Sequence, residues 1–249
     1  MSDPRQFAQA VEMTIATYDR AARDYAERRD TLPPHWIERM EQFVDLLAEA
    51  ERDAPIPQLG RPGDDITLEE YLQFMPVLDA GCGTGRDVRA LAGYGLPVLG
   101  VDLSQGMLDE AGERTARRLP KGSVRYALMD LRRLDLPDAS CRGVWCSASL
   151  LHLPKRMTPR AVAELARVTR RGGPLVVFVK QQESEVAEEM TPYPLADDVE
   201  MPRFFAYYTP EEARALLEQA GLEVREMAVR ADGRPGLHSW ISLLARRPA

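Results

Sequence analysis

The sequence predicts an α/β fold: a doubly wound, mostly parallel sheet of seven strands with a helical cap at the N-terminus. Two observations predict it. From residue 76 onward, runs rich in Val and Leu alternate with amphipathic helical stretches. Such alternation is typical of a parallel sheet that helices cover on both faces. A glycine-rich turn also follows the first of these runs and leads directly into a helical stretch, as expected of a strand–helix unit.

The composition indicates a globular chain with an unevenly distributed charge. Its 249 residues suit one large domain or a domain with a cap, and 45% of them are hydrophobic. The net charge of -7 is concentrated in one segment, because residues 183–202 contain seven acids and no Lys or Arg. The remaining 32 acids equal the 32 Lys and Arg residues. A body without surplus positive charge argues against a nucleic-acid partner.

Two further features bear on where the chain works. No apolar run approaches the ~18 residues that cross a bilayer, so we expect no membrane partner. The N-terminus lacks the charged-then-apolar pattern of a signal peptide, and we expect a cytoplasmic location. The cysteines are Cys82, Cys141 and Cys146, an odd number without a Cys-x-x-Cys pair. They fit a reducing compartment and predict no metal site. We expect a monomer or a homodimer.

The first 75 residues predict a helical cap, residues 1–52, and an irregular connector, residues 53–75. Apolar residues from Phe7 to Tyr25 recur at the three- and four-residue steps of one helix face. A Pro-Pro pair interrupts this pattern before a second amphipathic stretch begins at Trp36. The connector is rich in Pro and Gly. Within it, Thr67 and Glu70 have the spacing of a capping box, which predicts a short helix.

The rest of the chain, residues 76–249, supplies the predicted sheet. The strand-like runs are 76–80, 97–101, 123–128, 143–147, 174–180, 222–229 and 237–246, and the helical stretches between them are 86–92, 105–119 and 159–170. Another helix is predicted to begin at Thr209-Pro210 and to end before Gly221. The acidic segment falls within a predicted variable loop, residues 181–206. This loop leaves the fifth strand at its carboxyl end, where ligands bind in doubly wound sheets.

The glycine-rich turn carries the most specific chemical signal. It reads Asp79-x-Gly81-x-Gly83-x-Gly85, between a strand and a helix. Glycines permit positive φ and a close approach of ligand to backbone, and the amides at the helix start suit an anionic group. The next strand ends at Asp102, where a carboxylate can accept both hydroxyls of a ribose. Dinucleotide enzymes use such a site too, although their sixth motif position is usually glycine and here is Arg86. A tight turn without a ligand is the plainer interpretation.

The turn and several later segments resemble, in order, the motifs of the S-adenosylmethionine-dependent methyltransferases with a Rossmann-like (class I) fold, of the small-molecule bacterial type. The later segments are 98–104, 128–131 and 144–153, and the resemblance extends from Tyr18 to Arg246. It implies S-adenosyl-L-methionine as cofactor and S-adenosyl-L-homocysteine as product. It also implies transfer of a methyl group to an O, N, C or S nucleophile of a small-molecule acceptor. With no acids just after the fourth strand, we expect a metal-independent, in-line transfer.

The resemblance also implies the residues of the site. Those expected to contact the cofactor are Tyr25, Arg29, Asp79, Gly81, Gly83, Gly85, Asp102, Leu103, Met107, Asp130, Leu131, Cys146 and Ser147. Asp102 is the expected ribose ligand, and Asp130 with the next backbone amide is expected to recognise adenine. His152 is the candidate general base, or else a structural histidine of the Leu150–Leu153 turn. Tyr18 is expected to line the acceptor pocket, with core packing as the alternative.

The residues alone leave several interpretations open. A NAD(P)-dependent oxidoreductase and a non-catalytic S-adenosylmethionine-binding partner protein are the alternative functions. Cys146 can be read as a nucleophile, but no basic partner is evident and a small strand residue explains it as well. Finally, the seven acids of residues 183–202 suggest a loop that favours a neutral or cationic acceptor, such as an amine, over an anionic one. A solvated loop is the alternative.

Overall fold

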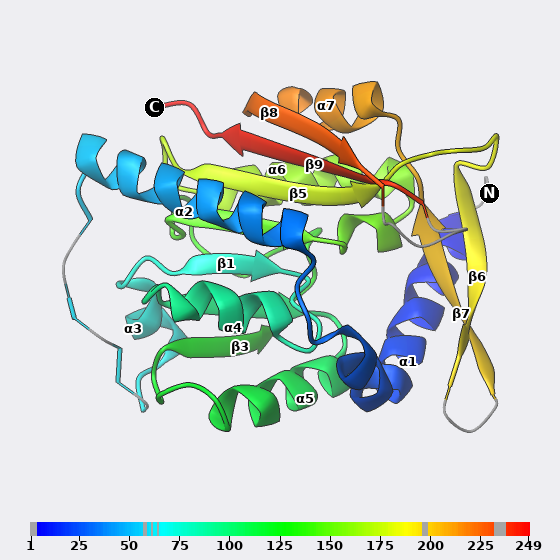
Figure 1. Cartoon of the computed structure of the whole chain (residues 1–249), viewed down its shortest axis with the longest axis horizontal. Coiled ribbons are helices and arrows are strands. Elements are labelled where there is room, and N and C mark those ends of the chain that lie inside the picture. Colours follow the sequence, from blue (N-terminus) through cyan, green and yellow to red (C-terminus); the bar gives the residue numbers. More distant parts are fainter. Residues whose placement is uncertain (1–3, 57–58, 61, 64, 196–198, 232–237) are drawn as a thin grey trace.

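The computed structural model describes residues 4–56, 59–60, 62–63, 65–195, 199–231 and 238–249 of the chain. Its centre is a seven-stranded sheet in the order β3-β2-β1-β4-β5-β9-β8 (Figure 1). The strands are β1 (Val77–Ala80), β2 (Val98–Asp102), β3 (Val124–Leu128), β4 (Gly143–Ser147), β5 (Pro174–Lys180), β8 (Glu223–Arg230) and β9 (Trp240–Arg246). In this sheet only β9 runs antiparallel to its neighbours. The predicted doubly wound, mostly parallel sheet of seven strands is therefore confirmed, and its order reverses between β1 and β4.

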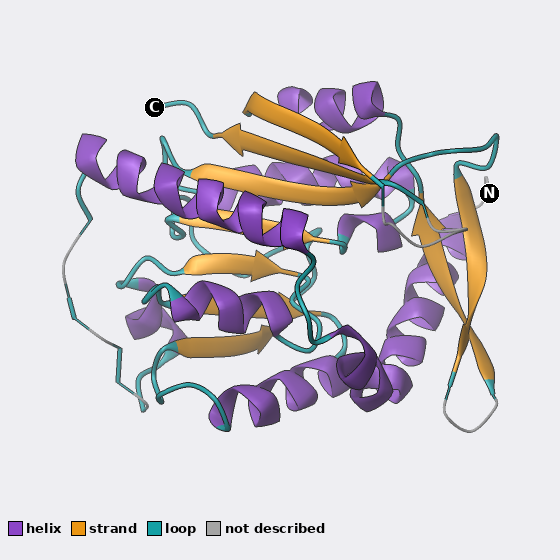
Figure 2. Cartoon of the chain, in the orientation of Figure 1, coloured by secondary structure: helices purple, strands orange, loops and turns teal. Residues whose placement is uncertain are grey.

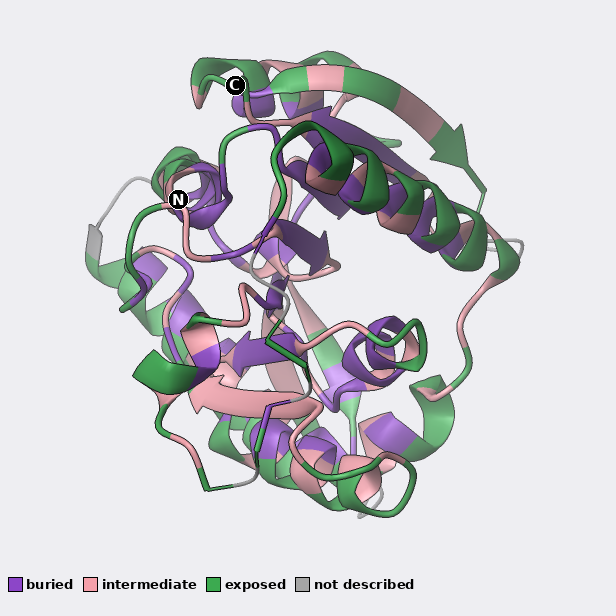
Figure 3. Cartoon of the chain, turned by 90° about the vertical axis from the view of Figure 1, so that its left-hand side faces the viewer, coloured by how far each residue is buried: buried purple, intermediate pink, exposed green. Residues whose placement is uncertain are grey.

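Helices cover both faces of this sheet (Figure 2). They are α1 (Pro4–Arg29), α2 (Pro34–Asp53), α3 (Leu68–Leu72), α4 (Arg86–Gly93), α5 (Gln105–Ala116), α6 (Thr158–Val168) and α7 (Pro210–Gln219). Successive strand residues serve opposite faces: Cys146 and Val177 pack toward α6 and α7, whereas Trp145 and Phe178 pack toward α2 and α4. Burial on both faces explains why the runs of the central strands β1, β4 and β5 are almost continuously apolar. Figure 3, viewed onto the edge where the parallel strands begin, shows buried central strands enclosed by helices with exposed outer surfaces, while the edge strand β8 is largely exposed.

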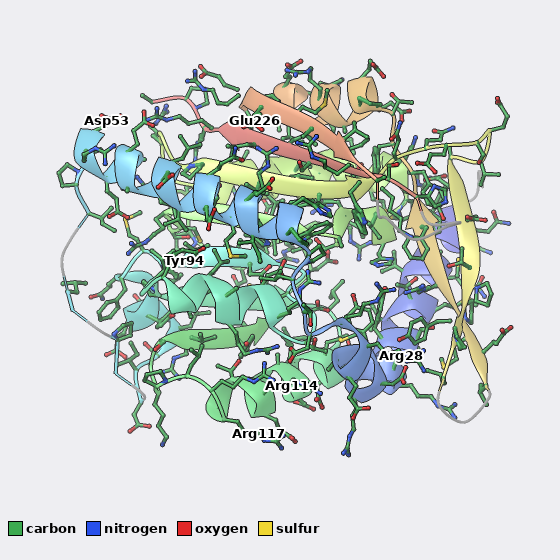
Figure 4. The ribbon with its side chains drawn as sticks, in the orientation of Figure 1. Arg28, Asp53, Tyr94, Arg114, Arg117 and Glu226 are labelled. Atoms are coloured by element: carbon green, nitrogen blue, oxygen red, sulfur yellow. The ribbon has the colours of Figure 1, made fainter. Side chains whose placement is uncertain are left out.

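The first helix, α1, lies at the carboxyl edge of the sheet, where it packs against α5 (Figure 1). The two helices approach closely, because a Cβ on Gly106 would lie 2.5 Å from the Asp19 carbonyl oxygen. Just after α1, the Asp30 carboxylate pairs with Arg118 at 2.8 Å and with Arg89 at 2.5 Å. Figure 4 labels Arg114 of α5, which lies 3.6 Å from the same carboxylate. This cluster fastens the end of α1 to the sheet domain.

The second helix, α2, packs on the face of the sheet rather than beside α1, with Phe43 and Leu47 in the same core as Trp145. The division into a cap (1–52), a connector (53–75) and a sheet domain (76–249) stays a prediction. Within the connector, the capping box of Thr67 and Glu70 is confirmed at the start of α3.

The acidic segment corrects one prediction. Residues 181–206 were expected to form a loop, but they contain a second, two-stranded antiparallel sheet of β6 (Glu188–Pro194) and β7 (Glu200–Ala206). We call these two strands the hairpin. Prolines and acids made the segment look irregular, yet Pro192 and Pro202 lie opposite each other in register, and proline is compatible with strands that have a free edge. The helix predicted over 105–119 also ends earlier, at Ala116.

The hairpin leaves and rejoins the sheet domain at adjacent points. Gln181 and Tyr208 form a bridge, and the Tyr208 amide donates to the Lys180 carbonyl at 2.9 Å. Between these points the hairpin stands against α1, with Tyr193 and Leu195 packed on Ala21 (Figure 1). None of the described helices has the length and apolar character that a membrane span requires.

Candidate functional site

A cavity opens at the carboxyl ends of β1, β2 and β4, where the strand order reverses and α1 covers the edge. Its lining residues are Val11, Thr14, Ile15, Tyr18, Tyr25, Arg29, Asp79, Gly81, Cys82, Gly83, Thr84, Arg86, Asp87, Asp102, Leu103, Ser104, Met107, Met129, Asp130, Leu131, Ser147, Ala148, Ser149, His152 and Leu153. Of the fifteen residues predicted for the site, this set contains all except Gly85 and Cys146. The structure thus brings together residues that lie more than a hundred positions apart.

The glycine turn shapes one wall of the cavity. Gly81 and Gly83 have positive φ values of 79° and 51°. A Cβ on Gly81 would lie 2.1 Å from the Cβ of Ser149, whereas a Cβ on Gly83 would meet nothing within 4 Å. Gly81 is therefore required by protein packing, and Gly83 leaves open space beside the backbone where a ligand can approach.

Asp102 is held by the backbone at the edge of this turn. Its carboxylate accepts the Gly83 amide at 2.8 Å and the Ser104 amide at 2.9 Å. Burial raises the pKa of Asp102, and the backbone hydrogen bonds oppose that shift. Ser104 caps α5 by accepting the Met107 amide and donates to Asp19 of α1 at 2.6 Å. The carboxylate is thus oriented from both sides and retains lone pairs for a ligand hydroxyl.

Asp79, at the base of the cavity, is buried, and its Oδ2 atom has no hydrogen-bond partner among the described residues. Its pKa is raised well above the ordinary range, first by burial and then by the charges of Asp87 and Asp102. Arg86 opposes this shift, but it is itself paired with Asp87 at 2.6 Å. A buried carboxyl group with two further carboxyl groups and one guanidinium near it suits a ligand with a positively charged group.

Asp130 lies where the adenine contact is predicted, but its carboxylate is already engaged. Arg132 donates to both of its oxygens, at 2.6 Å from Nη2 and 2.9 Å from Nε. Although burial raises the pKa of Asp130, these hydrogen bonds lower it below the usual range overall. Leu131 lines the cavity beside it. The predicted role of Asp130 therefore depends on carboxylate lone pairs that Arg132 leaves available.

Two predicted contacts lie outside the cavity. Gly85, with φ of 74°, begins α4, and a Cβ there would lie 2.4 Å from the Tyr126 hydroxyl. Cys146 is fully buried behind the cavity wall, with its Sγ 3.1 Å from Ser149 Oγ. Burial raises the pKa of Cys146 to about 12, which disfavours a thiolate nucleophile. Both residues belong to the packing that supports the cavity, and the predicted cofactor contact of Cys146 lacks a geometric basis.

Tyr18 and His152 face each other across the opposite end of the cavity. The Tyr18 hydroxyl lies 2.8 Å from His152 Nε2, and His152 Nδ1 lies 2.7 Å from the Phe204 carbonyl oxygen. Because a carbonyl only accepts, Nδ1 carries the proton and Nε2 accepts from Tyr18. The pKa of His152 is lowered to about 3, chiefly by burial and in part by the charges of Arg203 and Lys180, while the Phe204 hydrogen bond opposes this shift. The imidazole is therefore neutral and open to a proton at Nε2.

The pKa of His152 predicts how stability depends on pH. The unfolded chain binds a proton at the ordinary histidine pKa of 6.5, whereas the folded chain resists it down to about 3. The contribution of His152 to the free energy of unfolding is therefore fully present above about pH 6.5 and declines as the pH falls toward 3. We expect the unfolding midpoint of the wild type to fall more steeply between pH 7 and pH 4.5 than that of His152→Gln. Circular dichroism melts measure both, and parallel slopes would contradict the burial argument.

The five described acids of the acidic segment do not line the cavity, which corrects the expectation of seven carboxylates beside the pocket. Among the described acids, Glu188 accepts the Lys155 amide, Glu189 accepts the Tyr207 hydroxyl and Glu183 accepts the Ser239 amide. Neither these nor Glu185 and Glu200 line the cavity. Asp197 and Asp198 lie outside the described residues. The charge nearest to Tyr18 on the hairpin is instead the cation Arg203, one residue beyond the acidic segment, whose Nη1 donates to the Tyr18 hydroxyl at 3.3 Å.

Comparisons with known proteins find similarity to methyltransferases. A family model described as "Methyltransferase domain" matches residues 77–173, which include the glycine turn, Asp102 and His152. The O-methyltransferase cnsE of Penicillium expansum is 30% identical over 185 residues, covering 70% of this chain and 63% of that protein. The malonyl-[acyl-carrier protein] O-methyltransferase of Serratia marcescens is 41% identical over 133 residues, covering 52% and 45%. The chain thus spans less than two thirds of these curated relatives.

Among solved structures, the fold is similar to that of the Burkholderia thailandensis 1,6-didemethyltoxoflavin-N1-methyltransferase, which was solved with its substrate and S-adenosylhomocysteine. The TM-score is 0.63 at 20% identity, and the match covers all of this chain and 92% of that one. At this identity the likeness concerns the fold.

Proposed function

We propose that this chain, which belongs to the Rossmann-like (class I) S-adenosylmethionine-dependent methyltransferases, transfers a methyl group from S-adenosyl-L-methionine to an O, N, C or S nucleophile of a small molecule. The observation that carries the proposal is one cavity with two differently built ends. One end holds the glycine turn, Asp102 and Asp79, whose Oδ2 atom has no partner among the described residues, and the other holds the Tyr18–His152 pair. The family match favours this function over a NAD(P)-dependent oxidoreductase.

The residues of the first end fit the cofactor. S-adenosylmethionine supplies a methyl group that its positively charged sulfur already activates. Asp102, oriented by two amides, would accept the ribose hydroxyls, and the open space at Gly83 would admit the cofactor against the backbone. The negative charge of Asp79 would stabilise the cationic part, and Tyr25 and Arg29 of α1 line the cavity where they would receive the carboxylate. The predicted contacts of Leu103, Met107, Leu131 and Ser147 remain part of this proposal, and S-adenosylhomocysteine would be the product.

The second end fits the acceptor. A nucleophile that holds its proton at neutral pH needs a base, and His152 Nε2 is neutral and points to Tyr18. The chain's own contribution is then to hold the acceptor in line, to exclude water under α1 and to receive the proton. No metal enters this proposal.

The test has two stages. Thermal-shift screening with S-adenosylmethionine, S-adenosylhomocysteine and NAD(P)H identifies the cofactor, because a ligand of the native state raises the unfolding midpoint. A metabolite pool is then incubated with the protein and S-adenosylmethionine, and mass spectrometry searches for products heavier by one methyl group. Binding without any methyl product would favour the non-catalytic alternative. Stabilisation by NAD(P)H alone would overturn the proposal.

Asp79 yields a prediction for binding itself. Its raised pKa means that the free carboxyl keeps its proton at a higher pH than an ordinary aspartate. A bound cation favours the carboxylate, so binding of S-adenosylmethionine should release protons and its affinity should increase as pH rises through the free pKa. Calorimetry in two buffers of different ionisation enthalpy measures the release. Asp79→Asn should bind with the same enthalpy in both buffers, and the absence of a buffer effect in the wild type would contradict the prediction.

Location and assembly remain proposals as well. The three cysteines are free and buried, which supports a cytoplasmic, reducing location. We propose that the protein acts on a small-molecule acceptor and has no nucleic-acid or membrane partner. We also propose that it is a monomer or a homodimer.

A further inference from the structure

Arg203, on β7, brings a fixed cation to the Tyr18 hydroxyl. Its Nη1 donates to that hydroxyl at 3.3 Å. The guanidinium carbon lies 4.6 Å from the centre of the Tyr193 ring and 4.8 Å from that of Phe205. Two aromatic neighbours restrict the plane of the guanidinium and favour its charge. Its Nε atom is buried without a hydrogen-bond partner in the described part of the chain.

The backbone on both sides of Arg203 is bound to the helix that carries Tyr18. Thr17 Oγ1 donates to the Pro202 carbonyl at 2.6 Å, and the Phe204 amide donates to Thr14 Oγ1 at 2.8 Å. These bonds fix the register between β7 and α1, so the approach of Arg203 to Tyr18 is built into the packing of the two elements. The carbonyl of Phe204, the residue that follows Arg203, accepts from His152 Nδ1 and so fixes the His152 tautomer.

The hydrogen-bonding capacity of Tyr18 then leaves one position open. A phenol has one hydrogen and two lone pairs. The hydrogen goes to His152 Nε2 and Arg203 occupies one lone pair. One lone pair remains, and Tyr18 lines the cavity. This lone pair can accept a hydrogen bond from an acceptor molecule.

The surroundings indicate which kind of acceptor donates it. Near Tyr18 the cavity is lined by the apolar side chains of Val11 and Ile15 from α1 and of Leu153 beside His152, and no described acid of residues 183–202 lines it. The charged side chains around His152 are Arg203 of β7 and Lys180 of β5, both cations. An ammonium group is therefore disfavoured there, and a neutral hydroxyl on an apolar molecule is favoured.

We propose, building on the proposed function, that Arg203 is a positioning residue that turns Tyr18 toward His152 and leaves its free lone pair to the hydroxyl of a neutral, largely apolar acceptor. The acceptor O–H bond breaks and its proton passes to Tyr18, while the proton of Tyr18 passes to His152 Nε2. The electron pair left on the acceptor oxygen forms the bond to the methyl group, and the bond from that methyl to sulfur breaks with its electrons left on a neutral sulfur. The charge thus ends on the imidazole, from which the proton returns to solvent.

The test compares Arg203→Met, which keeps the apolar stem, with Arg203→Lys, which keeps the charge. ¹⁵N NMR of His152 in the cofactor-free protein is the first readout. We expect the wild type to show Nε2 hydrogen-bonded, Tyr18→Phe to give the signal of unbonded Nε2, and Arg203→Met to move toward that value. Arg203→Lys should remain nearer to the wild type. An unchanged Nε2 signal in Arg203→Met would overturn the positioning role.

Kinetics with a hydroxyl acceptor is the second readout. We expect kcat to fall by about tenfold in Arg203→Met, as for loss of one hydrogen bond to a charged group, with partial recovery in Arg203→Lys. The KM for S-adenosylmethionine should change by less than about twofold because the cofactor end is untouched. Arg225→Met, on exposed β8, is the matched control. An unchanged kcat in Arg203→Met would refute the proposal. If the wild type methylates nothing, the proposed function fails, and the NMR series still decides the role of Arg203.

Discussion

Asp102→Ala is expected to weaken the binding of S-adenosylhomocysteine by at least about a hundredfold. The carboxylate would accept two ribose hydroxyls, and hydrogen bonds to a charged group contribute about 1.5–3 kcal/mol each. The Gly83 and Ser104 amides would also lose the group that orients them. Isothermal titration calorimetry measures the change directly.

Asp109→Ala is the matched control for this substitution. Asp109 lies on the exposed side of α5, and its carboxylate accepts from Gln105 one turn away. It should bind with wild-type affinity, and circular dichroism should show both variants folded. Wild-type affinity in a folded Asp102→Ala protein would refute the ribose assignment.

His152→Gln is expected to lower kcat by about 10²-fold, the lower end of the usual contribution of a positioned general base, because a pKa of about 3 makes the imidazole a weak base. Glutamine can keep the bond to Phe204 but cannot take up a proton at the position of Nε2. Cofactor affinity should stay within about twofold, because the substitution lies at the acceptor end. Because the pKa of His152 is about 3, the wild-type rate should show no loss near pH 6.5 that depends on this residue.

Stopped-assay kinetics with S-adenosylmethionine and a hydroxyl acceptor measures both quantities. Tyr18→Phe should lose activity in the same direction, since it removes the proton path while leaving the ring in place. A His152→Gln protein with wild-type kcat would assign His152 to the structural interpretation, as the capping residue of its turn.

The sheet was predictable because each of its elements is specified locally. The central strand runs needed only continuous apolar residues, and the helix start at Thr209 needed only an N-cap residue followed by Pro210, to which the structure adds a capping box. The glycine turn was predictable for the same reason, since positive φ and the packing of Gly81 against Ser149 leave little choice of residue.

The acceptor end was less predictable because it is assembled from distant segments. Tyr18 and His152 could be named one at a time, but their hydrogen bond joins residues 134 positions apart. Arg203 was missed because nothing in its local sequence marks it, and its role depends on a strand pairing that prolines disguised. The count of acidic residues gave a wrong prediction of where the carboxylates lie, for a related reason. Counting carboxylates says how many there are, whereas the hydrogen bonds of Glu183, Glu188 and Glu189 determine where they face.

The adjacent ends of the hairpin have a consequence for how such an enzyme can be changed. Since Gln181 and Tyr208 pair with each other, the 26 positions between them close on themselves and the sheet continues without them. Insertions, deletions or replacements there cost little in chain entropy and do not alter the strand register of the sheet. We expect a relative's segment grafted between these two residues to change the surroundings of Tyr18 and His152, because Arg203 and Phe204 of this segment contact them.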